Sequence, residues 1–472
     1  MEKIYKKHIA FQNNLLIVGF GSISRGILPL IFRHIDIKPE QVTILTKKAE
    51  GPEIAAEFGV KVILAALNPE NYQTLLAKHL KPGDFLLNLS VDVSSAALIQ
   101  FCQQNDVLYL DTCIEPWEGG YVDAALSSSQ RSNYAIRETL LQQKKSKQQS
   151  TALVTHGANP GLVSHFVKQA LLNIARDTGK SLPTPQTREE WATFANALSI
   201  KTIHIAERDT QKTNYSKQSD EFVNTWSVDG FVAEGCQPAE LGWGTHERHW
   251  PHDACAHESG SGCAIYLNRP GATTRVRTWT PLSGPFHAYL ITHTESIAIA
   301  DYFTLKNGDE LFYRPTVHFA YHPCEEAVLS LQEFVGKEWQ QQARQRILYN
   351  EIIDGFDELG VLLMGHEKGA YWFGSQLSIQ QTRELTPYNN ATGLQVAIGA
   401  LAGMIWVIEN PRLGLVEPDE VAFDYILNIA TPYLGNVVGH YTDWTPLSNR
   451  GKLFPEEVDQ SDPWQFLNMR VA

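Results

Sequence analysis

A run of four apolar residues at positions 15–18 is followed by a Gly-Phe-Gly turn and then by apolar residues spaced three and four apart. The continuous run predicts a buried strand, and the spacing over residues 22–34 predicts a helix. Gly19 permits a tight turn between the two elements, and the missing side chain at Gly21 lets a pyrophosphate approach the backbone. The first amides of the helix then point at the phosphates. This pattern is typical of a dinucleotide-binding domain.

The glycine pattern departs from the usual G-x-G-x-x-G/A spacing in its third position, where Ser24 stands and Gly26 follows two residues later. Serine is small enough for the helix to pack on its strand. Pro29 lies inside the predicted helix and is expected to kink it. An acidic residue that would bind the ribose is expected after the second strand, which we place at residues 42–45. Lys47 and Lys48 stand there instead, so the pattern leaves NAD and NADP both open.

Strand and helix patterns then alternate along the first third of the chain. Further strands are predicted at residues 60–64, 85–89, 107–110 and 151–155, and helices at 72–79, 95–104 and 162–174. This alternation predicts an α/β fold with a doubly wound parallel sheet, in which ligands bind at the carboxyl ends of the strands. Gly19, Ser90, the segment 111–115 and the turn 156–161 all follow predicted strands, so one crevice should collect them.

The rest of the chain predicts a second domain of α+β type. A polar, helical stretch at residues 127–150, ending in KKSKQQS, is predicted to cross between domains, so we divide the chain into 1–150 and 151–472. Strands are predicted at 201–206, 273–279, 287–299 and 370–382, helices at 327–348, 393–408 and 419–430, and irregular chain at 241–269. The C-terminal helices are expected to pack back on the first domain. Gly399 and Gly403 are four residues apart, which favours close packing inside the core over a subunit interface.

Composition narrows the possible partners and compartment. The 472-residue chain is long enough for two or three domains, and its net charge of −13 without a basic stripe argues against nucleic acid and suits a cationic ligand. The N-terminus lacks the pattern of a signal peptide, and the longest apolar run, at 394–408, is shorter than the roughly 20 residues that span a bilayer. Six cysteines without a CxxC pair read as reduced thiols. We therefore expect a cytoplasmic protein that does not enter a membrane.

Three kinds of chemistry compete in the sequence. A metal site is disfavoured because the candidate ligands are irregularly spaced; they are His246, His249, His252, Cys255, His257 and Cys263. No G-x-S-x-G motif or recognisable cysteine motif indicates a nucleophile. The third possibility is a pocket of carboxylates and aromatic residues facing a bound dinucleotide. Its candidates lie in turns or at the ends of predicted strands: Glu115, Glu207, Trp226, Glu234, His293 and Asp357.

Several separate blocks of the chain together resemble the bacterial homospermidine synthases. They are VGFGSISRGILPLI, NLSVDVSS, DTCIEPWEGGY, THGANPGLVSHF, TWSVDGFVAEG and IIDGFDELGVLLMG. The resemblance extends over essentially the whole chain. It implies a saccharopine-dehydrogenase-like fold, in which a Rossmann domain is joined to a domain that forms the substrate pocket and a homodimer contact.

The resemblance also implies a reaction. NAD⁺ takes a hydride from putrescine, the resulting imine exchanges ammonia for a second putrescine, and the returned hydride reduces the new Schiff base to homospermidine. Glu234 and Asp357 would hold amino groups, and Glu207 and Glu115 would add negative field. Trp226 would face the substrate cation, and His293 would shuttle protons. The predicted cofactor-binding residues are Gly19, Gly21, Ser22, Ile23, Ser90, Asp111, Thr112 and Asn159.

Some alternatives remain open at this stage. Asp354, Asp357 and Glu358 lie within five residues, and the sequence does not decide which of them faces the pocket. A saccharopine- or amino-acid-type dehydrogenase with net redox turnover is the rival enzyme, and it should carry Arg or Lys for substrate carboxylates. A nucleotide-sensing protein is the rival without catalysis. No metal is expected, and the predicted partners are putrescine and related polyamines.

Overall fold

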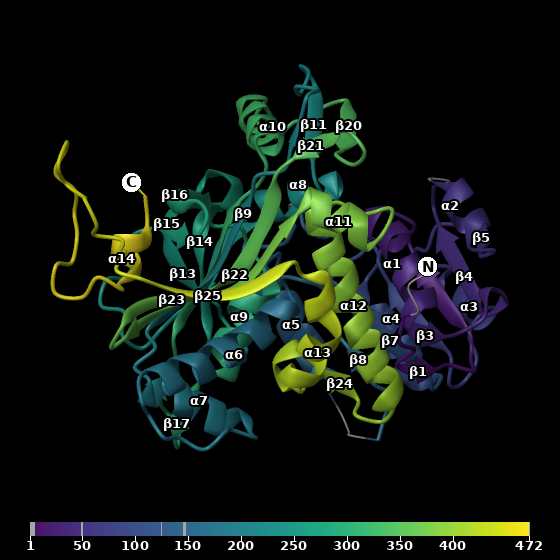
Figure 1. The fold of residues 1–472 in the computed structure, drawn as a ribbon, viewed down its shortest axis with the longest axis horizontal. Coiled ribbons are helices and arrows are strands. Elements are labelled where there is room, and N and C mark those ends of the chain that lie inside the picture. The colour runs from purple at the N-terminus through teal and green to yellow at the C-terminus, as the bar shows by residue number, and fades with distance from the viewer. Residues whose placement is uncertain (1–4, 49–50, 124, 145–147, 472) are drawn as a thin grey trace.

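The computed structural model describes residues 5–48, 51–123, 125–144 and 148–471. Figure 1 shows two sheets beside each other, the N-terminal one in purple and blue and the larger one in teal, green and yellow, with helix α12 (Ala391–Glu409) between them. The predicted fold class, a parallel α/β sheet followed by a second α+β part, is confirmed.

The first sheet has seven strands, and all neighbours run parallel. In chain order they are β2 (Leu15–Val18), β4 (Val42–Thr46), β5 (Lys61–Leu64), β6 (Phe85–Asn88), β7 (Leu108–Asp111), β8 (Ala152–Leu153) and β24 (Leu415–Val416). Their spatial order is β24-β8-β7-β6-β2-β4-β5. The chain therefore changes direction across the sheet between β2 and β6, and a crevice for ligands opens at such a switch point.

The helices of this part lie where the sequence patterns predict them, except the helix at Pro52–Glu57, which the sequence did not predict. They are α1 (Ser22–His34), α2 (Pro52–Glu57), α3 (Tyr72–Ala77), α4 (Ser95–Gln104) and α5 (Asn133–Gln142). Residues 145–147 of the predicted domain crossing lie outside the described residues. Two elements from later in the chain complete the unit, because β24 pairs with β8 and α12 packs on α1 and β7. The sheet thus takes strands from both sides of residue 150.

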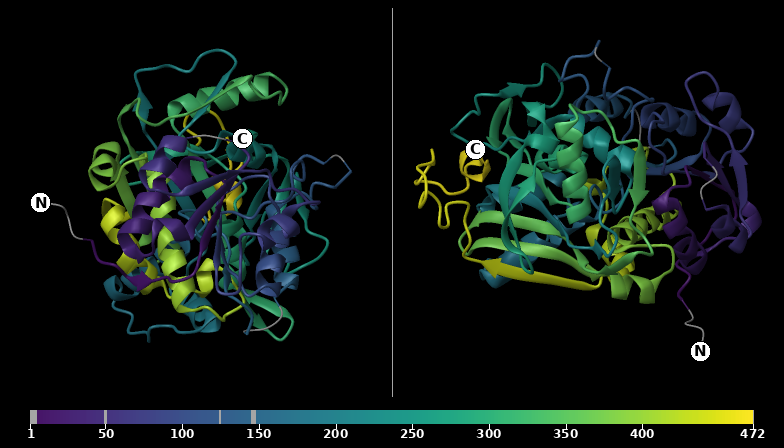
Figure 2. Two further views of the ribbon diagram at one scale, coloured as in Figure 1. Left: turned by 90° about the vertical axis from the view of Figure 1, so that its right-hand side faces the viewer. Right: turned by 90° about the horizontal axis from the view of Figure 1, so that it is seen from above.

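The second sheet has ten strands in mixed directions. They are β9 (Thr202–Asp209), β12 (Pro238–Gly242), β13 (Ala254–Ala256), β14 (Ala264–Pro270), β15 (Arg275–Thr280), β16 (Gly284–Tyr289), β19 (Thr316–His322), β22 (Phe356–His366), β23 (Gly369–Ser378) and β25 (Asn436–Thr442). The main path runs β13-β14-β12-β19-β9-β22-β23-β25, and β16 joins β15 to β19. Figure 2 shows this twisted sheet with β25 at its outer edge.

Helices and short strands cover this sheet and form a small lobe above it (Figure 1). The lobe contains β10 (Lys212–Thr213), β11 (Glu221–Asn224), α8 (Val228–Cys236), α10 (Glu325–Gly336), β20 (Arg344–Ile347) and β21 (Ile352–Asp354). The other helices are α6 (Leu162–Asp177), α7 (Arg188–Ala197), α9 (Thr294–Tyr302), α11 (Ile379–Leu385), α13 (Phe423–Ala430) and α14 (Phe466–Met469). Short strands complete the inventory: β1 (Ile9–Ala10), β3 (Ile35–Asp36), β17 (Leu305–Asn307) and β18 (Glu310–Tyr313).

Alternation along β9 gives the second sheet two buried faces. Ile203 and Ile205 belong to the core shared with α6 and α12, whereas Ala206 belongs to the core beneath β15 and β16. Because side chains alternate along a strand, Glu207 and Asp209 continue on the face of Ile203 and Ile205. Two acids at the end of this strand are therefore aimed towards the first sheet.

Three predictions about this half of the chain were wrong. The predicted strand 287–299 contains the end of β16 and most of helix α9. Within the predicted helix 327–348, α10 ends at Gly336 and strand β20 follows it. The predicted irregular chain 241–269 contains β13 and most of β14. Helix α9 is buried on nearly all sides, so its sequence lacks a polar face and reads as an apolar run. Strand β20 pairs with β11, which lies more than 100 residues earlier. The local sequence pattern does not predict such a distant contact.

Helix α12 is the long apolar helix that the sequence predicts. It is the only helix of the described residues that is long and apolar enough to span a membrane, and 89% of its apolar window is buried inside the protein. A Cβ atom at Gly399 would stand 2.1 Å from the carbonyl oxygen of Gly157. The expectation of close packing inside the core at Gly399 and Gly403 is confirmed.

Candidate active site

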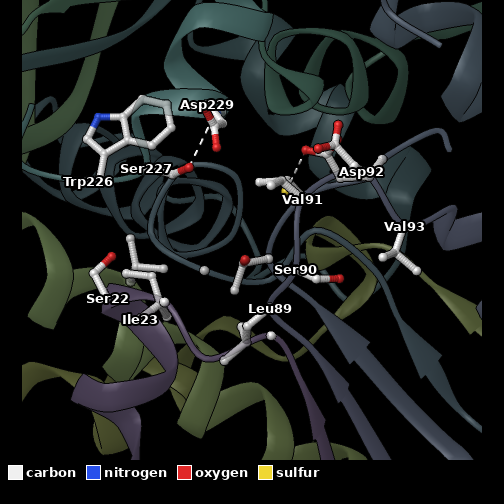
Figure 3. Close-up of a pocket in the computed structure, with 18 of the residues that line it drawn as sticks. Ser22, Ile23, Leu89, Ser90, Val91, Asp92, Val93, Trp226, Ser227 and Asp229 are labelled. Carbon is white, nitrogen blue, oxygen red and sulfur yellow. Dashed lines mark hydrogen bonds between the residues drawn. The ribbon is translucent and has the colours of Figure 1, made fainter. Parts of the chain in front are cut away.

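A cavity of about 330 Å³ lies between the carboxyl ends of the first sheet and the inner face of the second. Figure 3 shows Ser22, Ile23, Leu89 and Ser90 on one side of it and Trp226, Ser227 and Asp229 on the other. Most of the residues that the sequence singles out line this cavity: Gly19, Gly21, Ser22, Ile23, Ser90, Thr112, Glu115, Asn159, Glu207, Trp226, Glu234 and His293.

The β2–α1 turn leaves its backbone open to the cavity. Gly19 has a φ of +89°, and a Cβ atom there would lie 2.8 Å from the carbonyl oxygen of Leu89, so only glycine fits. A Cβ atom at Gly21 would meet no protein atom within 4 Å. The Ser24 hydroxyl donates to the Gly19 carbonyl at 2.7 Å and ties the turn to the helix. No described side chain caps the first turn of α1, which leaves its amides for an anion.

The end of β4 carries positive charge where a ribose-binding acid is common. Lys47 and Lys48 both line the cavity, and the Lys47 ammonium lies 3.6 Å from the carboxylate of Asp92. Burial is the main cause that raises the pKa of Asp92, and Lys47 opposes that rise. Asp92 was not among the residues singled out from the sequence. It follows β6, at the same edge of the sheet as Ser90.

The second sheet contributes a wall of acidic and aromatic side chains. Tyr321 on β19 stands opposite Glu207 on β9, and Phe319 lies two residues earlier on the same face. All three side chains line the cavity. The Asn159 amide donates to Glu207 Oε2 at 2.7 Å. Burial raises the pKa of Glu207 well above its usual value, and the nearby Asp357 carboxylate raises it further.

His293 lies between two carboxylates at the N-terminus of α9. Its Nε2 is 3.0 Å from Glu234 Oε2, and its Nδ1 is 3.1 Å from Glu295 Oε1. Burial alone would lower the pKa of His293, but the two carboxylates outweigh it and raise the pKa well above the usual value. The imidazole is therefore held in its protonated form at neutral pH. The predicted role of His293 as a proton shuttle stays a prediction.

Trp226 lies at the end of β11, in the turn that leads into α8. Its indole N–H donates to the Tyr321 hydroxyl at 3.1 Å, and its ring packs against Phe231 at 5.3 Å between centroids. Among the described residues, no Lys or Arg stacks on this ring. The indole is thus fixed in place and lines the cavity without a cation of the protein on its face.

Glu115 follows β7 and is 7% exposed. The Cys113 thiol donates to its Oε1 at 3.4 Å. Burial, together with the charges of Glu234 and Asp92, raises the pKa of Glu115 to about 8. The carboxyl group is therefore mostly protonated at neutral pH, and a cation entering the cavity would favour its ionised form.

Two of the predicted site residues do not line the cavity. The Asp111 side chain accepts hydrogen bonds from the Thr155 amide at 2.6 Å and the Tyr109 hydroxyl at 2.7 Å, and it is completely buried. Asp357 is also completely buried and accepts a hydrogen bond from Thr392, which does line the cavity. A direct contact of either carboxylate with a ligand is therefore not part of this geometry, and their assigned roles stay predictions.

The structure separates the three acids between which the sequence could not choose. Asp354 is exposed and pairs with Lys212 at 3.1 Å. Glu358 points to the other face of β22, where its Oε1 accepts from the Leu282 amide at 3.0 Å. Asp357 is the one that faces β9 on the side of Glu207, through its register with Asp209.

The histidine-rich segment lies away from the cavity. His249 Nε2 is 2.8 Å from Asp459, and His246 Nε2 is 3.1 Å from the carbonyl oxygen of Trp464. In the described part of the chain, no three His, Cys, Asp or Glu side chains come together as a metal site would require.

Several lining residues escaped the sequence reasoning. The alternating segment 316–322 could have revealed Phe319 and Tyr321 as neighbours on one strand face. Asp229 and Glu118 gave no signal, because each is a single acid in a loop or at a helix start. Six carboxyl groups of the described residues line the cavity: Asp92, Glu115, Glu118, Glu207, Asp229 and Glu234.

Comparison with known families agrees with this architecture. Residues 15–154 match the model described as the saccharopine dehydrogenase NADP binding domain, and residues 157–443 match the saccharopine dehydrogenase C-terminal domain. The homospermidine synthase of Blastochloris viridis is 53% identical over 463 residues, which cover 97% of both chains. The chain belongs to the homospermidine synthase family.

Two other comparisons support this assignment. The homospermidine synthase of Mesorhizobium japonicum is 50% identical over 97% of this chain and 96% of its own. The crystal structure of the homospermidine synthase from Legionella pneumophila, in complex with NAD, is 53% identical, covers 98% of both chains and superposes with a TM-score of 0.93. Saccharopine dehydrogenase from Saccharomyces cerevisiae, at 9% identity and a TM-score of 0.51, shares the fold alone.

The open space at Gly21 leads to a first prediction. In Gly21→Val, the Cβ atom of the new side chain would meet no protein atom within 4 Å, so the protein should fold with an unchanged melting temperature. The variant should lose NAD⁺ binding, measured by calorimetric titration, by at least about tenfold, since a pyrophosphate approaches the backbone at this position. Unchanged affinity would remove the nucleotide from this turn.

The raised pKa of Glu115 leads to a second prediction, for the protein without ligands. A carboxyl whose pKa rises from 4.5 to about 8 on folding stabilises the fold at low pH, and this stability is lost as pH rises through that interval. A tenfold change in the acid dissociation constant corresponds to about 1.4 kcal/mol. Glu115→Gln removes the titration, so the variant should match the wild type below about pH 4 and become relatively more stable towards about pH 8.5. A difference in melting temperature that is constant with pH would contradict the assignment.

Proposed function

We propose that this chain joins two putrescine molecules into homospermidine and releases ammonia, with NAD⁺ regenerated within each cycle. The observation that carries the proposal is the lining of the cavity: six carboxyl groups and an uncovered indole adjoin a glycine turn suited to a dinucleotide. A substrate with ammonium groups at both ends matches such a wall, because charge-assisted hydrogen bonds to carboxylates are strong.

The rival function, a dehydrogenase with net redox turnover, fits this cavity less well. Enzymes that bind amino-acid carboxylates need cationic side chains next to the reacting carbon. No Arg side chain of the described residues lines the cavity, and its two Lys residues, Lys47 and Lys48, stand at the end of β4 in the nucleotide half. The inner half is therefore arranged for cations.

The residues present fit a dinucleotide at the β2–α1 turn. Gly19, Gly21, Ser22 and Ile23 would hold the pyrophosphate, and Ser90, Thr112 and Asn159 would lie along the remaining length. When bound, the nicotinamide ring supplies a hydride acceptor that later returns the hydride. Asn159 is already fixed by Glu207, so the nucleotide half and the acidic wall are tied together at this point.

The side chains of the inner half would have different roles toward the substrate. Glu234, held by His293 on one side, would bind an amino group, and the protonated His293 would donate a proton to departing ammonia. Glu207 and the nearby buried Asp357 would provide negative charge for the second amino group. The Trp226 face would stabilise the substrate ammonium and the iminium charge of the Schiff base, a contact worth about 0.5–2 kcal/mol.

We also propose that the chain works as a homodimer in the cytoplasm. The support for both is the resemblance to the bacterial homospermidine synthases. The six cysteines are free thiols in the structure, which suits a reducing compartment.

The direct test is a turnover assay with putrescine and NAD⁺, in which homospermidine is followed by mass spectrometry and NADH by absorbance. We expect homospermidine without net NADH. Glu234→Gln is the matched control, since it should lose product formation while it keeps NAD⁺ binding. NADH that accumulates without a coupled polyamine would assign the chain to the dehydrogenases instead.

The Trp226 ring gives a sharper test of how the cation is held. Trp226→Phe keeps an aromatic face and should retain roughly 2- to 30-fold more kcat/KM for putrescine than Trp226→Ala, the factor that about 0.5–2 kcal/mol corresponds to. Both variants lose the hydrogen bond to Tyr321, so that loss cancels in the comparison. NAD⁺ affinity should be equal in the two proteins. Equal losses of kcat/KM would contradict the cation–π contact.

A further inference from the structure

Three carboxyl groups lie together on one face where β9 and β22 meet. Asp209 on β9 stands directly opposite Asp357 on β22, and Glu207 lies two residues before Asp209 on the same face. Cβ atoms of directly opposite residues are about 5 Å apart, and those of diagonal neighbours about 7–8 Å. Glu207 lines the cavity, whereas Asp209 and Asp357 lie behind it and are 0% exposed.

The Asp209 carboxyl group acts only as an acceptor in its hydrogen bonds. The Thr225 hydroxyl donates to one oxygen at 2.7 Å, and the Gln211 amide and side chain donate to the other at 2.8 and 3.2 Å. This arrangement favours the ionised carboxylate.

Asp357 is less well satisfied. It accepts one hydrogen bond, from Thr392, and its Oδ1 has no partner in the described part of the chain. The same Gln211 side chain that donates to Asp209 also donates to the Thr392 hydroxyl at 3.1 Å. A chain of polar groups therefore runs from Asp209 through Gln211 and Thr392 to Asp357, and the proton of the pair is better placed on Asp357.

Ion pairs with these three acids are absent from the described part of the chain. None of them forms an ion pair within 4 Å with a described Lys, Arg or His residue. Arg208 lies between Glu207 and Asp209 in the sequence, but its side chain points to the opposite face and pairs with Glu325 at 2.9 Å. Negative charge on these three acids is therefore not balanced by an ion pair within the described residues.

We propose that Asp209 is a positioning residue that acts through Asp357 and fixes the charge which Asp357 and Glu207 present to the diammonium substrate. The proposal rests on the proposed function, since it names how that same site is tuned. Asp209 itself touches neither the cavity nor a ligand. Its fixed negative charge keeps its two neighbours from ionising together until a cation arrives, at which point a proton leaves to solvent.

The electrostatic environment agrees with this role. Burial raises the pKa of Asp209 to about 6, so it is mostly ionised at neutral pH. Burial and then the charge of Asp209 raise the pKa of Asp357 well above its usual value. The other titratable or charged groups that act on the three acids are Arg208 on β9, Glu358 on β22, Tyr321 on β19, Cys324 before α10 and His293 before α9.

The test is Asp209→Asn, which keeps the size of the side chain and removes the charge. Loss of a neighbouring negative charge lowers the pKa of Asp357 and Glu207, so the acid limb of kcat/KM for putrescine should move to lower pH by about tenfold in proton concentration. Thr225→Val removes one donor to Asp209 and should move the limb in the same direction by less. This second variant also serves if Asp209→Asn fails to fold. Asp354→Asn, at an exposed acid that pairs with Lys212, is the matched control and should leave the profile unchanged.

A measurement without substrate separates this proposal from the proposed function. Infrared difference spectra of the NAD⁺-loaded protein follow the C=O band of buried protonated carboxyls as pH rises, and the midpoint of its loss should fall in Asp209→Asn. If the wild type makes no homospermidine, the proposed function fails while this midpoint still tests Asp209. Activity lowered equally at every pH, with an unchanged infrared midpoint, would overturn the proposal and leave Asp209 as a structural acceptor.

Discussion

The structure depends on burying carboxylates without cations to pair with them. Removing a charged group from water is costly, and proteins usually offset the cost with a partner of opposite charge. Here Glu207, Asp209 and Asp357 are buried together at one end of β9 and β22, with hydrogen-bond donors as their main support. Burial instead raises the pKa of Glu207 and of Asp357 well above its usual value.

The same cavity must hold a negatively charged dinucleotide. The groups that face the dinucleotide and the acidic side chains lie on different elements at opposite sides of the cavity. The phosphate end belongs to backbone amides at the N-terminus of α1, where charge is partial and fixed in direction. The cation end belongs to side chains of the second sheet and of α8. His293 stands on that side as a lining residue whose positive charge is created by its neighbours, Glu234 and Glu295.

The parts of this architecture that the sequence could predict are those with local causes. The β2–α1 unit has its cause in adjacent residues, and so have the alternating strands and helices of the first sheet. Most of the site residues predicted from the sequence line the cavity. Helix α9 could not be recognised, because burial on nearly every side removes the polar face that marks a helix. Asp111 follows a strand as a ligand-binding residue would, yet its side chain is bound by Tyr109 and Thr155. Which way a side chain turns at a strand end depends on contacts that are distant in sequence.

The first sheet is closed by residues that appear very late in the chain. Strand β24 lies at positions 415–416 and α12 at 391–409, so the edge beside β8 and the part of the sheet under α12 stay uncovered until these residues have been synthesised. The nucleotide half cannot finish folding before the substrate half has been synthesised. Gene fusion or domain exchange at the apparent boundary near residue 150 would leave an open, apolar sheet. The first sheet is therefore completed only by segments from the second half of the chain.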